Sequence, residues 1–342
     1  MPRQVIVREF GGPNVLRVED VPSPMPGAGQ VVVRLTSIGM NHAELMGRRG
    51  EYKLSSGEPP FVPGLEGGGV IDCVGDGVTA VKPGDRVILT PDAPRLSGGG
   101  SGGTYRTHYL AAVDQVLPAP PQVPDDQLGA LWLPYLTAWG CLVWKQQLRA
   151  GQVVAMPAAS SSVALAAAQI VKAIGGVAVG LTTSPGKVAA IRALPACRYD
   201  HLIVTHDADR TMRPWHRDLR PVAPKGVDVF FDPVASGAYL DTEIKCLAQH
   251  GCVWVYGLLG DPGPVDVTPL IRKHAAVRGW ALSELVAAGR SVWEPGCRWI
   301  LDRFADGTFA QHLGGRYPLA DVQRAHAEME QGRHIGKLVL VP

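Results

Sequence analysis

The chain has 342 residues, of which 46% are hydrophobic, and its 33 Lys and Arg nearly balance its 31 Asp and Glu. This length suffices for two domains with full cores, and the balanced charge excludes a basic face for nucleic acid. We find no signal-peptide pattern, and no membrane-spanning apolar run outside the small-residue helix described below. We therefore expect a cytoplasmic protein that binds neither nucleic acid nor membrane. The six cysteines lack C-x-x-C spacing, which favours reduced thiols.

The first 120 residues are rich in predicted β-strands separated by Gly and Pro turns. The strands are expected at residues 4–8, 31–36, 70–74, 86–89 and 105–110. The SGGGSGG stretch at residues 97–103 is expected to be a flexible loop within this region. A helical region is expected at residues 125–145, and it leads into a more informative segment.

Residues 153–184 are predicted to form a strand, a tight turn, a helix and a second strand. The run at 153–156 is apolar on both faces, as in a buried parallel strand, and Gly175-Gly176 ends the helix at 163–174. A small-residue turn at a helix N-terminus leaves backbone N–H groups free to hold a diphosphate. The usual G-x-G-x-x-G glycines are absent, with Ser160–Ser162 and Ala164 near their places, and serine does not tolerate positive φ as glycine does. An ordinary βαβ packing turn is the alternative. Strands at 226–232 and 252–257 are expected to continue the sheet, and 337–341 is the last expected strand.

Together these segments resemble the medium-chain dehydrogenase/reductase superfamily, in its zinc-free quinone oxidoreductase-like branch. The motifs that carry the resemblance follow one another along essentially the whole chain. They are the segments 10–16 (FGGPNVL), 39–44 (GMNHAE), 49–52 (RGEY), 63–69 (PGLEGGG), 74–75 (VG), 84–87 (GDRV), 103–105 (GTY), 136–139 (LTAW), 232–234 (DPV) and 336–339 (GKLV).

The resemblance implies an α/β fold with two domains and a cofactor cleft between them. Residues 1–120 and 265–342 would form a split, GroES-like β-barrel catalytic domain. Residues 121–264 would form a Rossmann domain with a doubly wound parallel sheet. The family also implies a homodimer, for which residues 251–257 and 265–267 are the candidate sheet edge.

We predict that the protein holds no functional metal. A catalytic zinc needs three ligands from Cys, His or carboxylate, whereas Met40, Leu65 and Pro157-Ala158 stand where zinc members carry them. The four-cysteine structural zinc loop is missing as well. His42, Glu44 and Glu66 remain as possible ligands, but Glu66 is expected to bind loop amides.

Without a metal to polarise an isolated carbonyl, the easier target is an activated C=C, as in an enone, an enoyl compound or a quinone. The resemblance places Asn41 and Tyr52 in the nicotinamide pocket as catalytic residues. Asn41 would donate to the developing oxyanion, and Tyr52 would donate to it or protonate the α-carbon. The alternatives are a turn cap for Asn41 and a rim aromatic for Tyr52, with water as the proton source.

The segment after the second strand favours NADPH over NADH. NAD enzymes carry an acid there to hold the ribose diol, whereas this chain has TTSPGK at 182–187, with hydroxyls and the charge of Lys187 for a 2′-phosphate. Two alternatives remain open: Lys187 could be a solvated lysine without a phosphate role, and Lys337 could be exposed to solvent. The expected cofactor-binding residues are Thr137, Ser160, Ser161, Ser162, Val163, Thr182, Thr183, Ser184, Lys187, Tyr256, Gly257, Leu258 and Lys337.

The expected activity is therefore that of an NADPH-dependent quinone oxidoreductase, or of a 2-alkenal or enoyl reductase. Two other classes stay open. A carbonyl reductase or a non-redox biosynthetic enzyme would use the same fold, and a binding protein with a degenerate cofactor site would keep the fold without the activity.

Overall fold

A computed structural model describes residues 1–52, 57–94 and 102–342. Most of the predicted loop at 97–103 lies outside these residues. The chain forms two compact units, of which the first holds Met1–Leu133, Cys297–Gly307 and Leu313–Pro342. The second holds Pro134–Gly296 and Thr308–His312. No helix of the described residues is both long and apolar enough to cross a membrane.

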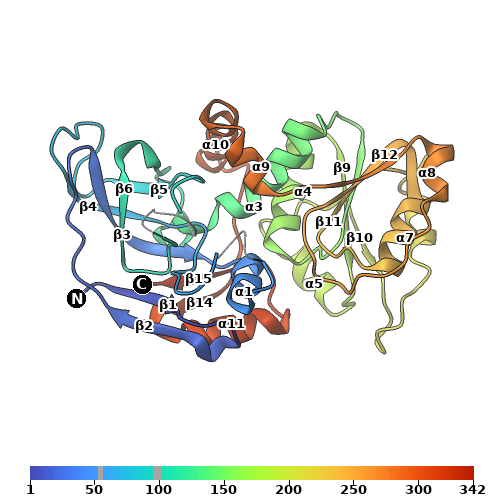
Figure 1. The fold of residues 1–342 in the computed structure, drawn as a ribbon. Coiled ribbons are helices and arrows are strands. Elements are labelled where there is room, and N and C mark those ends of the chain that lie inside the picture. The colour runs from blue at the N-terminus through green and yellow to red at the C-terminus, as the bar shows by residue number, and fades with distance from the viewer. Residues whose placement is uncertain (53–56, 95–101) are drawn as a thin grey trace. The chain divides into compact units, whose positions relative to one another are not determined.

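The first unit is built around a long antiparallel strand, β3 (Gln30–Gly39), which pairs with β4, β6 and β15. Its side chains are apolar for most of its length, because both faces are largely buried. The described strands form a seven-stranded sheet, and a separate hairpin joins β1 to β2 (Figure 1). The strands are β1 (Arg3–Val7), β2 (Leu16–Asp20), β4 (Gly68–Val74), β5 (Arg86–Leu89), β6 (His108–Ala112), β7 (Val116–Pro118), β14 (Leu313–Pro318) and β15 (Lys337–Val341).

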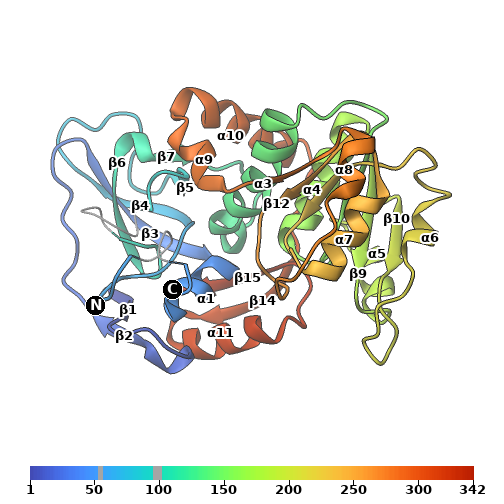
Figure 2. The ribbon, with the colours of Figure 1, turned by 45° about the vertical axis from the view of Figure 1, so that its right-hand side comes forward.

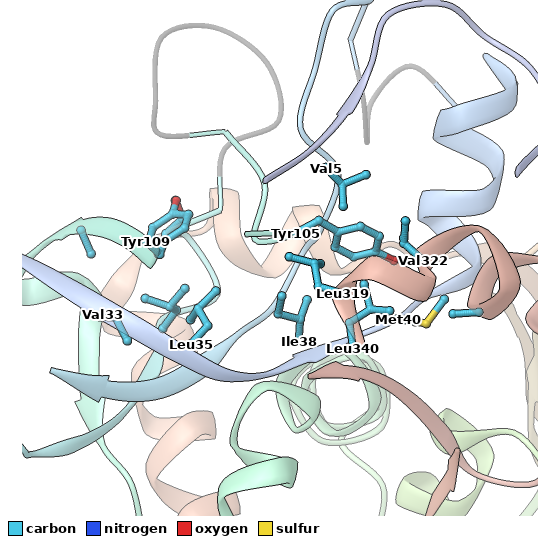
Figure 3. Packing of buried hydrophobic residues seen from close by; sticks show 14 of the residues in the cluster. Val5, Val33, Leu35, Ile38, Met40, Tyr105, Tyr109, Leu319, Val322 and Leu340 are labelled. Atoms are coloured by element: carbon cyan, nitrogen blue, oxygen red, sulfur yellow. The ribbon is translucent and has the colours of Figure 1, made fainter. Parts of the chain in front are cut away.

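The core of this unit lies between the sheet and the segments that cover it. Figure 3 shows Ile38 and Met40 packing near Tyr105, Leu319 and Leu340 within one apolar cluster. The described helices of the unit that position polar groups are α1 (His42–Arg49) and α11 (Val322–Gln331). The described part of the unit also contains 3₁₀ helices, which are η1 (Pro13–Val15), η2 (Val113–Gln115), η3 (Asp125–Ala130) and η5 (Leu319–Asp321).

The second unit contains a parallel sheet with the strand order β10-β9-β8-β11-β12-β13. Figure 2 labels β9, β10 and β12 of this sheet. Each neighbouring pair in it is parallel, and the order reverses between β8 and β11. This is the Rossmann order, in which ligands bind at the carboxyl ends of the strands on both sides of the reversal. The strands are β8 (Val153–Met156), β9 (Val177–Thr182), β10 (His201–Val204), β11 (Val227–Asp232), β12 (Leu247–Val255) and β13 (Ala276–Gly279).

Helices connect these parallel strands, as crossover connections require. They are α4 (Ser162–Ile174), α5 (Lys187–Arg192), α6 (His216–Leu219), α7 (Gly237–Cys246) and α8 (Thr268–Lys273), while α9 (Leu282–Ala287) follows the last of these strands. Two further helices, α3 (Trp132–Trp139) and α10 (Arg290–Ala305), contain residues of both units.

The helical region expected at residues 125–145 is broken into three parts, which are η3, α3 and the π-helical turn η4 (Gly140–Lys145). Gly129 leaves helical geometry inside η3, with φ −88° and ψ 17°. Gly140 packs so closely on Trp280 that a Cβ there would lie 2.6 Å from the indole ring. Both breaks depend on contacts made elsewhere in the fold.

The prediction that residues 251–257 form an edge of the sheet is wrong. These residues belong mainly to β12, which is paired on one side with β11 and on the other with β13. Among the described strands the edge next to β12 is therefore β13, which the apolar pattern of the short sequence AVRG does not reveal. The sheet also continues beyond residue 264, where the sequence predicts the Rossmann domain to end; the limits of the domains as independent folding units stay a prediction.

Candidate functional site

The turn between β8 and α4 lies at the carboxyl end of the strand beside the reversal of strand order. Ser161 is the N-cap of α4, and its Oγ accepts a hydrogen bond of 3.2 Å from the Ala164 N–H. The left-handed residue of the turn is Ala158, with φ 52°, whereas Ser161 is extended at φ −73°. The serine positions therefore need no glycine, because the turn takes its positive φ before them.

Ser160, Ser161, Ser162 and Val163 surround the start of α4, and all four are half-buried. A helix N-terminus carries partial positive charge and unpaired N–H groups, which favour an anion. The sequence predicts a phosphate site here, and the local geometry of the turn and helix is compatible with it.

Lys187 joins this turn to the segment after the second strand. It begins α5, and its Nζ donates a hydrogen bond of 3.4 Å to Ser160 Oγ. Burial lowers the pKa of this half-buried lysine. Thr182 is buried at the end of β9, and its Oγ1 accepts from the Ser184 N–H at 3.3 Å, while Thr183 is exposed. The chain thus gathers a cation and three hydroxyls at the ends of β8 and β9.

Tyr256, Gly257 and Leu258 follow β12 at the same carboxyl edge of the sheet. The Tyr256 N–H donates to the Asp232 carbonyl at 2.9 Å, and its ring stacks on Phe231 with 4.0 Å between the centroids. Burial raises the pKa of Tyr256 well above its usual value, while the facing Ser161 side chain opposes this rise. Leu258 is 63% exposed.

Thr137 lies on α3, away from the phosphate turn in sequence, and its side chain is largely buried. Its carbonyl accepts a hydrogen bond of 2.9 Å from the Trp280 indole N–H. Tyr135, on the same helix, is fixed by Gln169 of α4, whose Nε2 donates to the phenol oxygen at 3.0 Å. Tyr135 is thus a packing residue in this unit, as are the neighbouring tryptophans.

The first unit brings together two residues for which the sequence predicts different roles. Lys337, at the start of β15, donates through Nζ to the Asn41 Oδ1. Lys337 is only 1% exposed and also forms an ion pair of 2.6 Å with Glu66. In this structure its ammonium therefore binds within the unit, rather than lying exposed.

Asn41 is the N-cap of α1 and forms a capping box with Glu44, whose carboxylate accepts from the Asn41 backbone N–H. The Asn41 Nδ2 lies within 3.2 Å of Glu44 Oε1, 3.2 Å of Glu66 Oε1 and 3.3 Å of the Gly39 carbonyl. An amide has two N–H donors, so these three acceptors already use its capacity. A substrate oxygen must displace one of them.

Glu44 and Glu66 are buried carboxyls that the sequence assigns no catalytic role. Glu66 accepts at 3.0 Å from the Leu133 N–H, which lies in the first turn of α3 and not in a loop, and Glu44 accepts from the Leu65 N–H at 3.1 Å. Burial raises the pKa of Glu44 to about 8, against the opposing effects of Lys337 and Asn41. The Lys337 ammonium forms its ion pair with Glu66.

Tyr52 lies after the left-handed Gly50 that ends α1, and its side chain is half-buried. It belongs to the first unit, as Asn41 does. Residues 53–56, which follow it, lie outside the described part of the chain.

The possible metal ligands His42, Glu44 and Glu66 all belong to the first unit. In the described residues there is no group of three or more His, Cys, Asp or Glu that could hold an ion. Met40 is buried in the apolar cluster, and Glu66 already binds an ammonium and an amide. Burial and the nearby Arg49 lower the pKa of His42, which favours its neutral form.

Comparison with known proteins shows to which family the chain belongs. Residues 27–121 match the alcohol dehydrogenase GroES-like domain, and residues 198–340 match a family model described as zinc-binding dehydrogenase. The mouse (Mus musculus) quinone oxidoreductase is 31% identical, over 99% of this chain and 97% of that protein. The chain belongs to the medium-chain dehydrogenase/reductase superfamily, in its quinone oxidoreductase-like branch. Its first unit is accordingly the GroES-like part and its second the Rossmann-like part of the family fold.

Solved structures share the fold of this chain over nearly its whole length. A structure titled NAD-dependent alcohol dehydrogenase has a TM-score of 0.84 and 28% identity, covering 99% of each chain. A mycobacterial member complexed with NADPH has a TM-score of 0.83 and 26% identity, covering 100% of each chain. The family thus includes proteins named for either nicotinamide cofactor.

Proposed function

We propose that this protein is a zinc-independent oxidoreductase that uses NADPH to reduce an activated C=C, with a quinone, enone or enoyl compound as substrate. The observation that carries the proposal is the turn at the start of α4, where a serine-capped helix N-terminus meets Lys187 at the reversal of strand order. Bound there, NADPH supplies the hydride. The rest of the chemistry belongs to the chain's own residues.

The preference for NADPH follows from charge. Thr182, Thr183 and Ser184 present hydroxyls after β9, and no carboxylate in that segment would repel a 2′-phosphate. Lys187 adds a positive charge that burial makes less well hydrated. The structure of a family member complexed with NADPH supports the same choice.

Zinc independence follows from the polar cluster of the first unit. Its carboxylate Glu66 already binds a buried cation, the Lys337 ammonium, so a second cation would have to displace it. Met40 and Leu65 offer no replacement ligand, because a thioether and an alkyl chain bind zinc poorly or not at all. In this proposal the chain therefore holds no catalytic zinc, although one of the matching family models is described as zinc-binding dehydrogenase.

Asn41 and Tyr52 remain the proposed polar helpers of the substrate. Asn41 is held in place by Lys337 and by the capping box, and it would exchange one of its three acceptors for the substrate oxygen. Tyr52 is the proposed donor of the single proton that completes the reduction after hydride transfer, since a phenol supplies one without a metal. The remaining expected residues, from Thr137 to Lys337, keep their proposed cofactor role, except that Lys337 acts through Asn41.

The test is NADPH oxidation, followed in the ultraviolet, over quinones, enones, enoyl thioesters, aldehydes and simple ketones. The enzyme is expected to turn over at least one of the first three classes and to keep its activity after dialysis against a chelator. Turnover of simple ketones alone would contradict the substrate class. Activity that is lost on chelation and regained with zinc would contradict zinc independence.

Two finer properties stay part of the proposal. We expect a homodimer, argued below from β13, and a cytoplasmic location. Neither is needed for the assay just described.

A further inference from the structure

Two carboxyl groups lie beside each other in the interior of the second unit. Asp232 ends β11, and Glu243 lies on α7, and both side chains are 0% exposed. The Asp232 carboxylate accepts the Val234 N–H at 2.6 Å through Oδ1 and the Ala235 N–H at 2.9 Å through Oδ2. Within the described part of the chain, neither carboxyl oxygen of Glu243 has a hydrogen-bond partner. An unpaired buried carboxylate is costly, so this arrangement needs an explanation.

A proton on Glu243 provides that explanation. Burial, together with the neighbouring Asp232, raises the pKa of Glu243 well above its usual value. Once protonated, Glu243 becomes an O–H donor, and Asp232 is the acceptor that faces it. Two backbone N–H groups favour the charged form of Asp232, whereas no donor favours a charged Glu243. The hydrogen bonds therefore favour a proton on Glu243 over one on Asp232.

No cation among the facing groups replaces this proton. The titratable groups that act on the pair are Tyr239 and Cys246 of α7 and Tyr256 after β12. Burial raises the pKa of each of them, which keeps them neutral. Lys273 and Arg220 act on Cys246, three residues along α7 from Glu243, but not on Glu243 itself, and the Lys273 Nζ donates to the Ile244, Lys245 and Leu247 carbonyls.

The pair lies beneath two connected backbone segments. Asp232 shapes the turn at 233–236, in which Ala235 takes a φ of 52°. That turn holds the next one, since the Leu259 N–H donates to the Pro233 carbonyl at 2.9 Å and the Gly260 N–H to the Val234 carbonyl at 2.8 Å. The contact is tight, because a Cβ on Gly257 would lie 2.9 Å from the Pro233 oxygen. The loop at residues 256–260 contains Tyr256, Gly257 and Leu258, which the sequence predicts to bind the cofactor.

We propose that Glu243 is a positioning residue, whose protonated carboxyl donates to Asp232 and thereby holds the 233–236 turn and the 256–260 loop in the conformation that binds NADPH. This inference rests on the proposed function for its link to the cofactor. Loss of the proton would place two negative charges side by side in a buried site. The turn would then loosen, and the affinity for NADPH would fall as the pH rises.

The direction in which stability changes with pH follows from the difference in proton binding between the folded and unfolded states. The folded state holds a proton on Glu243 above the ordinary value of 4.5, at which the unfolded chain releases it, so stability is lost as the pH rises through this window. Glu243→Gln keeps an N–H donor for Asp232 but has no proton to lose. Glu243→Leu keeps the volume and removes the donor.

The experiment measures the dissociation constant of NADPH by fluorescence from about pH 6 to about pH 10, the range in which a raised carboxyl titrates. Backbone amide exchange, corrected for the intrinsic pH dependence, is followed without nucleotide at residues 233–236 and 256–260. The wild type is expected to lose affinity and protection as the pH rises, whereas Glu243→Gln keeps both. Glu243→Leu is expected to bind about tenfold more weakly at every pH, because Asp232 loses its donor.

Lys245→Gln provides the control on α7, since the Lys245 side chain is 54% exposed and forms a surface ion pair with Asp241. It should follow the wild-type pH profile. A Glu243→Gln enzyme with that same pH profile would overturn the proposal, as would a Glu243→Leu enzyme with unchanged exchange in both segments. If Glu243→Leu does not fold, the Glu243→Gln profile decides. If the wild type binds no NADPH, the proposed function fails, while the exchange data still test the positioning role.

Discussion

At the scale of single residues, the candidate site depends on long cationic side chains whose ends are placed by a partner. Lys187 reaches back from α5 to Ser160, and Lys337 is buried against Glu66 and Asn41. The first remains half-exposed and able to meet a phosphate, whereas the second already has its anion. The two lysines that the sequence predicts for the cofactor site therefore lie in different surroundings, Lys187 half-buried in the second unit and Lys337 buried in the first.

Lys187 should set the choice between the two nicotinamide cofactors. In Lys187→Met the dissociation constant for NADPH is expected to rise at least tenfold, about 1.4 kcal/mol, while that for NADH stays the same, because only NADPH has a 2′-phosphate. Isothermal titration calorimetry with both cofactors measures this. Lys172→Met, which removes a surface ion pair at the other end of α4, is the control. Equal affinities of the wild type for NADPH and NADH would show that the prediction is wrong.

Tyr52 should affect turnover if it is the proton donor. Tyr52→Phe is then expected to lower kcat by about 10²-fold, the low end for general acid catalysis, with little change in NADPH affinity. Steady-state kinetics with the best quinone or enone measure the effect, with Tyr317→Phe on β14 as the control. A higher KM at unchanged kcat would instead assign Tyr52 to the rim of the substrate pocket.

At the scale of elements, the buried strands could be predicted from the sequence, whereas the breaks within the helical region at residues 125–145 could not. Residues 86–89, 153–156 and 337–341 match β5, β8 and β15, because short apolar runs bounded by turns have few other structures open to them. The break of the 125–145 helix was not predictable, since Gly140 is required by the distant Trp280 ring. The same holds for the site. The serine turn and Lys187 follow from the Rossmann pattern, whereas Glu243 becomes important only because the fold places it beside Asp232.

The serine turn makes an element-scale prediction. Ser161→Ala removes the hydrogen bond to the Ala164 N–H, and we expect a loss of about 1 kcal/mol in the free energy of unfolding, as for other N-caps. Urea unfolding measures it. Ser236→Ala is a matched control, because Ser236 is the N-cap of α7 but its side chain makes no capping hydrogen bond. Equal losses in the two variants would count against a capping role for Ser161.

At the scale of the whole molecule, each unit has its own sheet and its own apolar cluster, and the two carry different parts of the proposed function. The polar cluster around Lys337 belongs to the first unit, and the cofactor turns belong to the second. The second unit also has an unpaired sheet edge in the described chain, at β13. Its apolar side chains are unusually exposed in that region, with Val267 59%, Ile271 76% and Val277 37% accessible.

An exposed apolar edge strand is a template for pairing with another copy of the chain. We therefore expect a homodimer joined through β13, with a mass by light scattering of twice the 36.4 kDa of one chain at micromolar concentration. Val277→Asp places a charge at this edge and should shift the protein to monomer without unfolding it. Val341→Asp, at an equally exposed valine that ends β15 in the first unit, should remain dimeric. A monomeric wild type would refute the dimer, and a dimeric Val277→Asp variant would move its interface away from β13.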